Sequence, residues 1–329
     1  MKLVPRHYDY VLGPPNTSAP GPNQTALLSS IAPGQIITGI PLTLDSDAPF
    51  LLRGRALRVP YPVSMSCTKS QPINNVLMRY TGPNNNYLAR GFVRQSLEMS
   101  FGGQFAQWRP VSPQVLYPAS GTILVDIQND SSSVTITNLT LYFRGVKLYP
   151  EGSRPAYTYP PKYSSLPFVY PVAPVTPSNP AGLIQSLGVT ETRLNQIFTV
   201  QDDADFVLRS LQLGGNTLTV PVPPDAAYFE VFVRLRDPDN LAYSNDYVHV
   251  DVLGGYGDAD VGYGIGSSGD TITPSAAGPA NPGWLYPEIY LPRNAILKYD
   301  IQRTDSAYGG CADTLDFPIA LSGSKIFYR

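Results

Sequence analysis

Residues 113–128 read PQVLYPASGTILVDIQ, and residues 287–302 read PEIYLPRNAILKYDIQ. In both stretches a short apolar segment ends at proline, a turn of small or polar residues follows, and a second apolar segment runs into Asp-Ile-Gln. Short segments rich in β-branched and aromatic residues, bounded by turn residues, predict β-strands. Because the same pattern occurs once in each half of the chain, it indicates a duplicated structural unit.

Three further motif pairs occur in the same order in both halves of the chain. They are DAPFLLR at 47–53 with DADFVLR at 203–209, FVR at 92–94 with FVR at 232–234, and GVKLY at 145–149 with GSKIF at 323–327. The spacing between motifs changes across segments rich in Asn, Pro and Gly, where surface loops tolerate insertions. We therefore predict two homologous domains, at residues 36–149 and 197–329, the second with a Gly-rich loop at 253–283.

The composition of the 329-residue chain favours β-structure. Hydrophobic residues make up 43% and charged residues 15%, and the 34 prolines leave few stretches of helix length. Short strands separated by turn residues, without a helical pattern between them, are typical of antiparallel sandwiches. The fold class that we predict is all-β, with two tandem antiparallel β-sandwich, jelly-roll-like domains joined by a Pro/Tyr-rich strap.

Two Pro-rich segments fall outside these domains: an extended N-terminal arm at 1–35, and the strap at 150–196, which has room for a short helix within 182–196. Both carry apolar and aromatic side chains that a fully solvated chain would avoid. The arm either packs on its own domain or docks on a neighbouring subunit. We predict that six residues of the arm and strap include intersubunit contacts: Tyr8, Tyr10, Leu12, Tyr157, Tyr159 and Tyr163.

Catalytic and metal-binding patterns are scarce in this sequence. The two histidines, His7 and His249, lie in the arm and in a strand-like stretch, and no nucleophile elbow, P-loop or HExxH motif occurs. The acidic groups at 202–205 and 237–240 do not have the spacing of an EF-hand loop. Asp203 recurs as Asp47, which favours a structural role such as a turn or cap. We expect no catalytic, cofactor-binding or metal-ligating residues, no cofactor and no enzyme activity.

The repeated pattern runs D-x-x-F-x-L-R, then F-V-R, P-[QE]-[VI]-x-x-P, D-I-Q and finally G-x-K. It resembles a family of tailed-bacteriophage virion structural proteins, in both repeats but not in the arm or strap. The resemblance implies β-sandwich modules and a location in the virion, which assembles in the host cytoplasm. It implies no catalytic residues and does not say which part of the particle the chain occupies.

The leading functional hypothesis is a non-enzymatic capsid decoration or cement protein. It would contact the major capsid protein or other virion proteins through the arm and strap, and it would form a homo-oligomer in the particle. A net charge of −2 disfavours nucleic-acid binding, and no stretch of 18 apolar residues indicates a membrane span. Three alternatives stay open: a neck or tail-associated ring or adaptor protein, a double jelly-roll major capsid protein, and a host-glycan-binding module with Trp108 and Trp284 as stacking platforms.

The duplication also makes two structural predictions. If the repeats share one topology, Phe50 and Phe206 occupy equivalent buried positions. Gly145 and Gly323 each precede the closing strand motif, so we expect each to lie at a bend or bulge, where a residue without Cβ is needed.

Overall fold

The structure is a computed structural model, and it describes residues 3–16, 20–59, 76–94, 109–152, 163–173, 176, 183–188, 190–213, 231–249, 288–304 and 314–328. Within these ranges every strand pair in the sheets is antiparallel, and the helical content is a single 3-10 turn, η1 (Ala26–Leu28). The predicted all-β class is therefore confirmed. The Gly-rich loop expected at 253–283 lies outside the described residues.

The chain forms two compact units. Domain 1 comprises Met1–Ala156 together with Tyr243–Tyr247, and domain 2 comprises Tyr157–Ala242 with Val248–Arg329. Five residues that follow strand β15 of the second repeat thus belong to domain 1. Each domain is described separately below.

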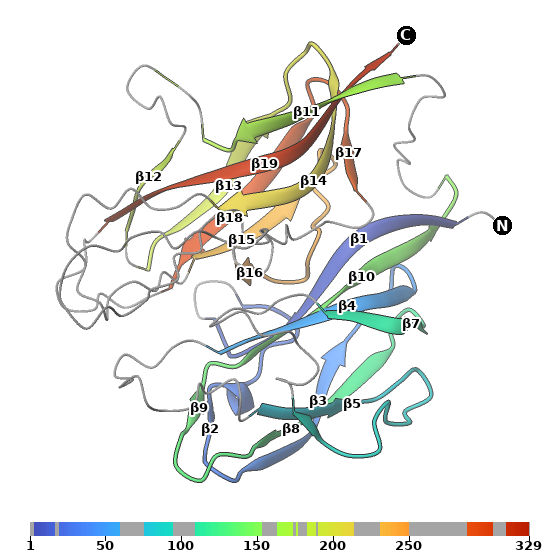
Figure 1. The fold of residues 1–329 in the computed structure, drawn as a ribbon, viewed down its shortest axis with the longest axis vertical. Helices are drawn as coiled ribbons and strands as arrows, with labels where there is room; N and C mark the ends of the chain where they lie inside the picture. The colour runs from blue at the N-terminus through green and yellow to red at the C-terminus, as the bar shows by residue number, and fades with distance from the viewer. Residues whose placement is uncertain are drawn as a thin grey trace. The chain divides into compact units, whose positions relative to one another are not determined.

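The described part of domain 1 contains two four-stranded sheets, which form two layers in Figure 1. The first sheet consists, in spatial order, of β1 (Leu3–Leu12), β10 (Thr140–Pro150), β4 (Phe50–Arg58) and β7 (Arg109–Tyr117). The second sheet consists of β3 (Ile36–Thr43), β8 (Thr122–Asn129), β5 (Val76–Tyr80) and β6 (Val93–Arg94). A short pair, β2 (Ser30–Ile31) with β9 (Ile136–Thr137), accompanies them.

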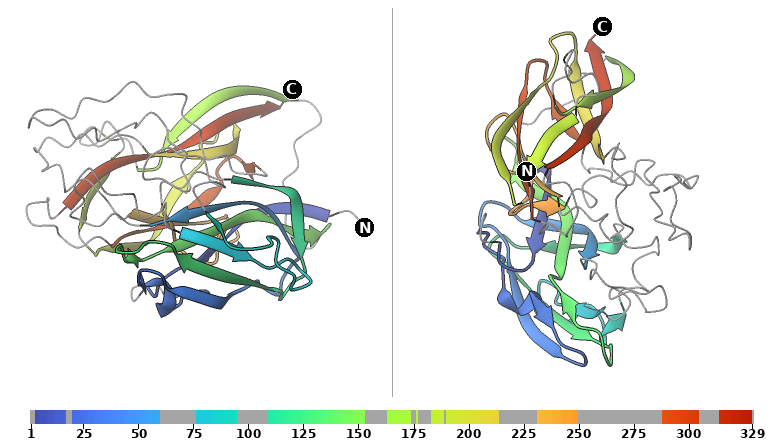
Figure 2. Two further views of the ribbon diagram at one scale, coloured as in Figure 1. Left: turned by 60° about the horizontal axis from the view of Figure 1, so that its bottom comes forward. Right: turned by 90° about the vertical axis from the view of Figure 1, so that its left-hand side faces the viewer.

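Domain 2 also contains two main sheets. The first consists of β11 (Tyr163–Pro171), β19 (Thr314–Tyr328), β14 (Asp205–Leu213) and β17 (Ile289–Leu291), and β12 (Leu183–Gly188) pairs with the first half of β19. The second consists of β13 (Thr192–Thr199), β18 (Ile296–Arg303), β15 (Val231–Arg236) and β16 (Val248–His249). Figure 2 shows β11 running beside β19 in both views.

The two domains share one strand order. When the eight main strands of either domain are lettered B to I along the chain, one sheet reads B-I-D-G and the other C-H-E-F. This is the arrangement of a jelly roll, an eight-stranded sandwich of two Greek keys. The predictions of jelly-roll-like domains and of like topology in both halves are confirmed.

The local predictions about Phe and Gly are confirmed as well. Phe50 and Phe206 are fully buried, and they lie opposite equivalent lysines in β10 and β19. At Gly145 the register of β10 against β4 shifts, and at Gly323 the register of β19 against β14 shifts. In both cases the extra residue of the bulge is the arginine that ends the D-x-x-F-x-L-R motif.

One motif pair from the sequence is incorrect. The FVR stretch at 232–234 lies in β15, and its equivalent is β5, not the FVR stretch at 92–94. The register proves the correspondence, because Arg79 of β5 lies opposite Asp126 and Arg234 of β15 lies opposite Asp300. A three-residue strand motif recurs by chance in a β-protein, so only strand pairing identifies true equivalents.

The expected N-terminal arm is a strand of domain 1. Residues 3–12 form β1, which pairs with β10 along its whole length. Tyr8, Tyr10 and Leu12 belong to the buried core of domain 1 together with Leu28. The reason is physical: pairing with β10 satisfies the backbone of β1, and burial removes its aromatic rings from water.

The strap also differs from its expected form. Within 150–196, the strand β11 is the equivalent of β1 and opens the second jelly roll. The expected short helix is replaced by β12 and β13, which pair with β19 and β18. A short isolated helix is marginal in water, whereas β19 and β18 offer backbone hydrogen-bond partners along one side of β12 and β13.

Candidate functional site

A buried lysine organises one end of domain 1. The Lys147 ammonium lies 3.7 Å from the centre of the Tyr8 ring and 5.8 Å from that of Tyr10. Its Nζ is 2.6 Å from Asp45 Oδ2 and 2.9 Å from Asp47 Oδ1. The Tyr8 hydroxyl donates to the same Asp45 oxygen at 2.8 Å. The buried charge is therefore balanced by two carboxylates and enclosed by aromatic faces.

The same cluster is present in domain 2. The Lys325 ammonium lies 4.0 Å from the centre of the Phe168 ring and 5.5 Å from that of Tyr170. Its Nζ donates to Gln201 Oε1 and Asp203 Oδ2, each at 2.7 Å. Burial alone would lower the pKa of Lys325, but Asp203 and Tyr170 raise it above its usual value.

Comparison of the two clusters indicates a structural role. Where domain 1 has Tyr8 and Asp45, domain 2 has Phe168 and Gln201, so a hydroxyl donor and its charged acceptor change together. Because donor and acceptor change together, neither domain keeps a hydroxyl at this position without its acceptor. An unpaired buried polar group would lower the stability of the domain. Each lysine thus joins the first and last strands of a jelly roll to the connection between its second and third main strands, and each is occupied by internal partners.

A second duplicated cluster lies at the bulge that begins the other sheet. In domain 1 the fully buried Asp126 accepts the Gly39 N–H at 2.7 Å and the Arg79 Nε at 2.7 Å. Burial raises the pKa of Asp126, but the Gly39 N–H, Tyr87 and Arg79 outweigh it and hold the pKa below its usual value. Gly39 has φ +71°, a conformation that favours glycine.

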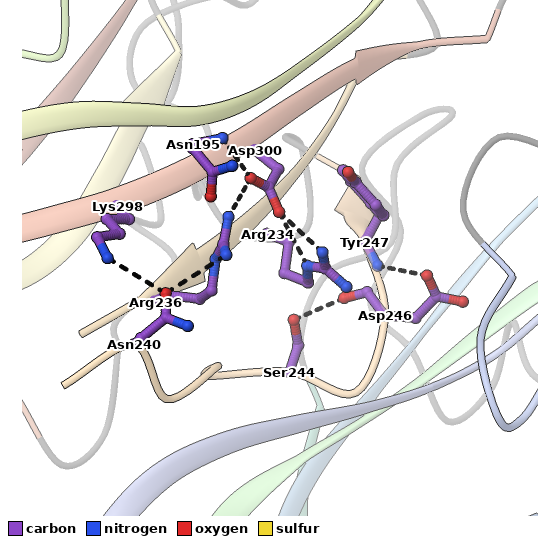
Figure 3. A network of polar contacts seen from close by, with 9 residues as sticks. All are labelled: Asn195, Arg234, Arg236, Asn240, Ser244, Asp246, Tyr247, Lys298 and Asp300. Atoms are coloured by element: carbon purple, nitrogen blue, oxygen red, sulfur yellow. Dashed lines mark hydrogen bonds and ion pairs between the residues drawn. The ribbon is translucent and has the colours of Figure 1, made fainter. Parts of the chain in front are cut away.

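In domain 2 the corresponding carboxylate is Asp300, shown in Figure 3 with its partners. It accepts the Asn195 N–H at 2.8 Å and the Arg234 Nη2 at 2.8 Å, and it also pairs with Arg236. Asn195 has φ +54°, matching the left-handed glycine of domain 1. The carboxylate therefore fixes a bulge by satisfying the backbone N–H that the bulge exposes.

The outer edge of β1 is covered by Tyr243–Tyr247, the five residues that domain 1 takes from the second repeat. The Asp9 N–H donates to the Tyr243 carbonyl at 2.9 Å, and the Asn245 N–H donates to the Asp9 carbonyl at 3.3 Å. The Asn245 side chain also accepts the Val11 N–H at 2.6 Å and donates to the Val11 carbonyl at 3.1 Å. The guanidinium of Arg6 lies 4.5 Å from the centre of the Tyr243 ring.

Of the six residues expected at intersubunit contacts, four lie in the described ranges, in β1 and β11. Tyr8, Tyr10 and Leu12 are buried inside domain 1, where they pack in its own core. Tyr163 begins β11, and Tyr157 and Tyr159 lie outside the described residues. Contacts of these residues with other subunits stay a prediction, and the observed burial of the first three matches the alternative in which the arm packs on its own domain.

Other sequence candidates have internal roles. Asp203 pairs with Lys325, and Asp205 accepts hydrogen bonds from the Tyr290 hydroxyl and the Arg293 N–H. Within the described ranges no group of three or more His, Cys, Asp or Glu residues could hold a metal ion. No helix in those ranges is long and apolar enough to cross a membrane. Trp108 and Trp284 lie outside the described residues.

Domain 2 encloses a small apolar cavity between its sheets. Its volume is about 10 Å³, and Phe198, Tyr299 and Leu321 are among its lining side chains. This is room for about one water molecule, so the cavity is a packing defect and not a ligand site.

The buried tyrosines make stability sensitive to alkali. Burial raises the pKa of Tyr299 to about 12, and it raises the pKa of Tyr117 beyond that. Unfolded tyrosines lose their protons near pH 10, so between about pH 10 and 12 the unfolded state binds fewer protons than the folded state and stability falls. Each such tyrosine contributes about 1.4 kcal/mol per pH unit.

We expect the free energy of unfolding, measured with denaturant, to decrease steeply over this pH range. Tyrosinate absorbance should rise together with unfolding. The Tyr299→Phe variant should show a shallower decrease. Normal ionisation of all tyrosines near pH 10 in the folded protein would contradict the prediction.

Neither a protein-family model nor a curated protein matches the sequence. Among solved structures, PNGase F, a glycosylasparaginase from Flavobacterium meningosepticum, is 10% identical over 96% of both chains with a TM-score of 0.21. A chain of infectious bursal disease virus, Gx strain, is 11% identical over 100% of this chain and 73% of that one, with a TM-score of 0.22. The CUB1-EGF-CUB2 domain of human MASP-1/3 is 10% identical over 96% and 99%, with a TM-score of 0.21. Likeness at these scores carries no argument about function.

Proposed function

We propose that this chain is a non-enzymatic structural protein of a virion, in which its two jelly-roll domains are building blocks of the capsid shell. The observation that carries the proposal is the strand order B-I-D-G and C-H-E-F, repeated in both domains. The jelly roll is a common architecture of viral capsid proteins, and it also serves lectins and other proteins. The fold favours a capsid role. Because one fold serves many functions, the polar clusters of the two domains must also be consistent with that role.

The polar clusters support a building block more than a catalyst. Lys147 and Lys325 are enclosed by partners within their own domains, as are Asp126 and Asp300. A catalytic site needs charged groups in a cleft that a substrate can enter. These groups instead join strands and fix bulges, so they stabilise the jelly-roll domains.

Among the roles that the sequence left open, a double jelly-roll major capsid protein is now the best supported. The decoration role rested on an arm and a strap that reach other subunits, and β1 and β11 are sheet strands of their own domains. Two jelly rolls in one chain give a shell protein two similar blocks with which to cover a surface. Partners would then be further copies of this chain and other virion proteins.

The test is the abundance and position of this chain in purified virions. Mass spectrometry would quantify its share of the particle protein, and an averaged reconstruction would locate its domains. We expect the chain to be the most abundant shell protein, with its jelly rolls tiling the surface. A more abundant shell protein beneath it would favour decoration, and confinement to one vertex would favour a neck ring. Absence from the particle would overturn the proposal.

A further inference from the structure

The segment that covers β1 has a close counterpart in the first repeat. Before it, the connection between β15 and β16 forms a turn closed by an Arg236–Ala242 bridge, and the connection between β5 and β6 forms a turn closed by a Thr81–Tyr87 bridge. Both turns carry an asparagine with positive φ, at +64° in the former and +59° in the latter. Residues 88–92 are therefore the equivalent of Tyr243–Tyr247.

The two equivalent segments differ in exposure. Within the chain Tyr243 is buried, whereas its counterpart Leu88 is 46% exposed. The neighbours of Leu88 are also accessible, since Arg90 and Gly91 are exposed. The first repeat thus has, at residues 88–92, a segment equivalent to Tyr243–Tyr247 whose apolar residue, Leu88, is exposed to solvent.

The strand edge that would receive it is also open. β11 is the equivalent of β1 and the edge strand of its sheet. Asp9 is buried beneath its covering segment, whereas its counterpart Val169 is 49% exposed. Leu166, which corresponds to Arg6, is 58% exposed. Exposed apolar side chains on an edge strand are a liability unless something covers them.

The prolines of β11 restrict what can cover this edge. Pro167 and Pro171 flank Val169 on the outward side of the strand, and proline has no N–H to donate. Addition of a long strand would therefore lack the two hydrogen bonds that N–H groups at these positions would donate. The docking seen at β1 uses both backbone groups of one residue, Asp9, and its counterpart Val169 retains both groups.

We propose that residues 88–92 of one copy of this chain dock on the β11 edge of a second copy, in the way that Tyr243–Tyr247 dock on β1. The residue pairs at the equivalent positions are chemically matched. Arg6 with Tyr243, a cation with an aromatic ring, is replaced by Leu166 with Leu88, two apolar side chains.

The second pair is matched as well. Asn245 both accepts from and donates to the backbone of Val11. In the proposed contact these positions hold Arg90 and Pro171, and proline offers only the carbonyl that a donor-only arginine requires. Each substitution on one side is thus accompanied by a compatible substitution on the other.

This contact joins different surfaces of the two copies. A head-to-tail interface of this kind closes into a ring or extends into a filament. The inference rests on the duplication and not on the virion role, so it stands or falls separately from the proposed function.

The test uses the purified full chain in sedimentation-velocity experiments over a range of concentrations. We expect the wild-type chain to self-associate, and Leu166→Arg to raise the dissociation constant about tenfold or more, because the new cation faces Leu88. Adding Leu88→Tyr to this variant recreates the Arg6–Tyr243 pair of domain 1, and we expect it to restore association. Circular dichroism would verify that each variant is folded.

Ile197→Arg is the matched control, since Ile197 is 56% exposed on β13 in the other sheet of the same domain. We expect it to associate as the wild type does. A wild-type chain that stays monomeric at the highest attainable concentration would overturn the proposal. So would a Leu166→Arg variant that associates normally, or a loss of association in the Ile197→Arg control equal to that in Leu166→Arg.

Discussion

Gly145→Ala is expected to destabilise domain 1 by about 4 kcal/mol or more, which is an exceptional loss for one methyl group. A Cβ at this position would overlap the carbonyl oxygen of Leu51 and lie 2.7 Å from a ring carbon of Phe50. The backbone oxygen belongs to the paired strand β4 and cannot move without breaking the sheet. Phe50 is fully buried, so its ring cannot rotate away at low cost.

Gly323→Ala should act in the same way on domain 2. Its Cβ would overlap the Val207 carbonyl oxygen and lie 2.9 Å from the ring of Phe206. Denaturant unfolding of the full chain should therefore show one early transition in either variant, assigned to the substituted domain by hydrogen exchange. The double variant should lose both domains.

Gly91→Ala is the matched control, because a Cβ at Gly91 has no neighbour within 4 Å. Its unfolding free energy should stay within about 0.5 kcal/mol of that of the wild type. If Gly145→Ala proves as mild as this control, the close approach of β10 and β4 at the bulge is wrong.

The sequence predicts the duplication because the residues that the fold constrains most tightly recur. The D-x-x-F-x-L-R motif combines an acid that pairs with the buried lysine, a core phenylalanine and the bulge arginine. The G-x-K motif combines the glycine beneath that phenylalanine with the lysine itself. Asp47 and Asp203 have a structural role, as their recurrence predicts, because each pairs with the buried lysine of its domain.

The first strand of each repeat could not be matched from sequence. β1 reads LVPRHYDYVL and β11 reads YSSLPFVYP, and their shared features reduce to two aromatic positions beside the lysine. A strand at a sheet edge is constrained by what covers it, and Tyr243–Tyr247 cover β1. In the sequence alone, the prolines of both segments favour an arm and a strap over strands.

Only part of the Asp126 and Asp300 clusters is predictable from the sequence. Asp-Ile-Gln recurs, but the partners of the aspartate come from strands whose residues diverge, VLMRY in β5 and VFVRLR in β15. The bulge that each carboxylate fixes is built from Gly39 in one domain and from Asn195 in the other. Glycine and asparagine both adopt this left-handed conformation, so a comparison of residue identities does not reveal that Gly39 and Asn195 are equivalent.

Asp300→Ala should cost domain 2 about 3–5 kcal/mol of stability, the usual loss when one partner of a buried ion pair is removed. The carboxylate is fully buried and accepts from Arg234, Arg236 and the Asn195 N–H. Its loss leaves two guanidinium groups and one backbone N–H without their acceptor. Asp300→Asn keeps an acceptor for the N–H but removes the charge, so we expect a smaller loss.

Asp126→Ala is the informative comparison because its carboxylate faces one arginine, Arg79, at the equivalent position. We expect a loss of about 2–3 kcal/mol in domain 1, smaller than that of Asp300→Ala, since fewer charges are left unbalanced. The exposed Asp239→Ala serves as the neutral control, within about 0.5 kcal/mol of wild type. Denaturant unfolding would measure these differences in unfolding free energy from the shifts in the transition midpoints. The dependence of the unfolding free energy on denaturant concentration should be unchanged. Equal, small losses in Asp300→Ala and Asp239→Ala would mean that the Asp300 carboxylate does not hold the bulge in β13.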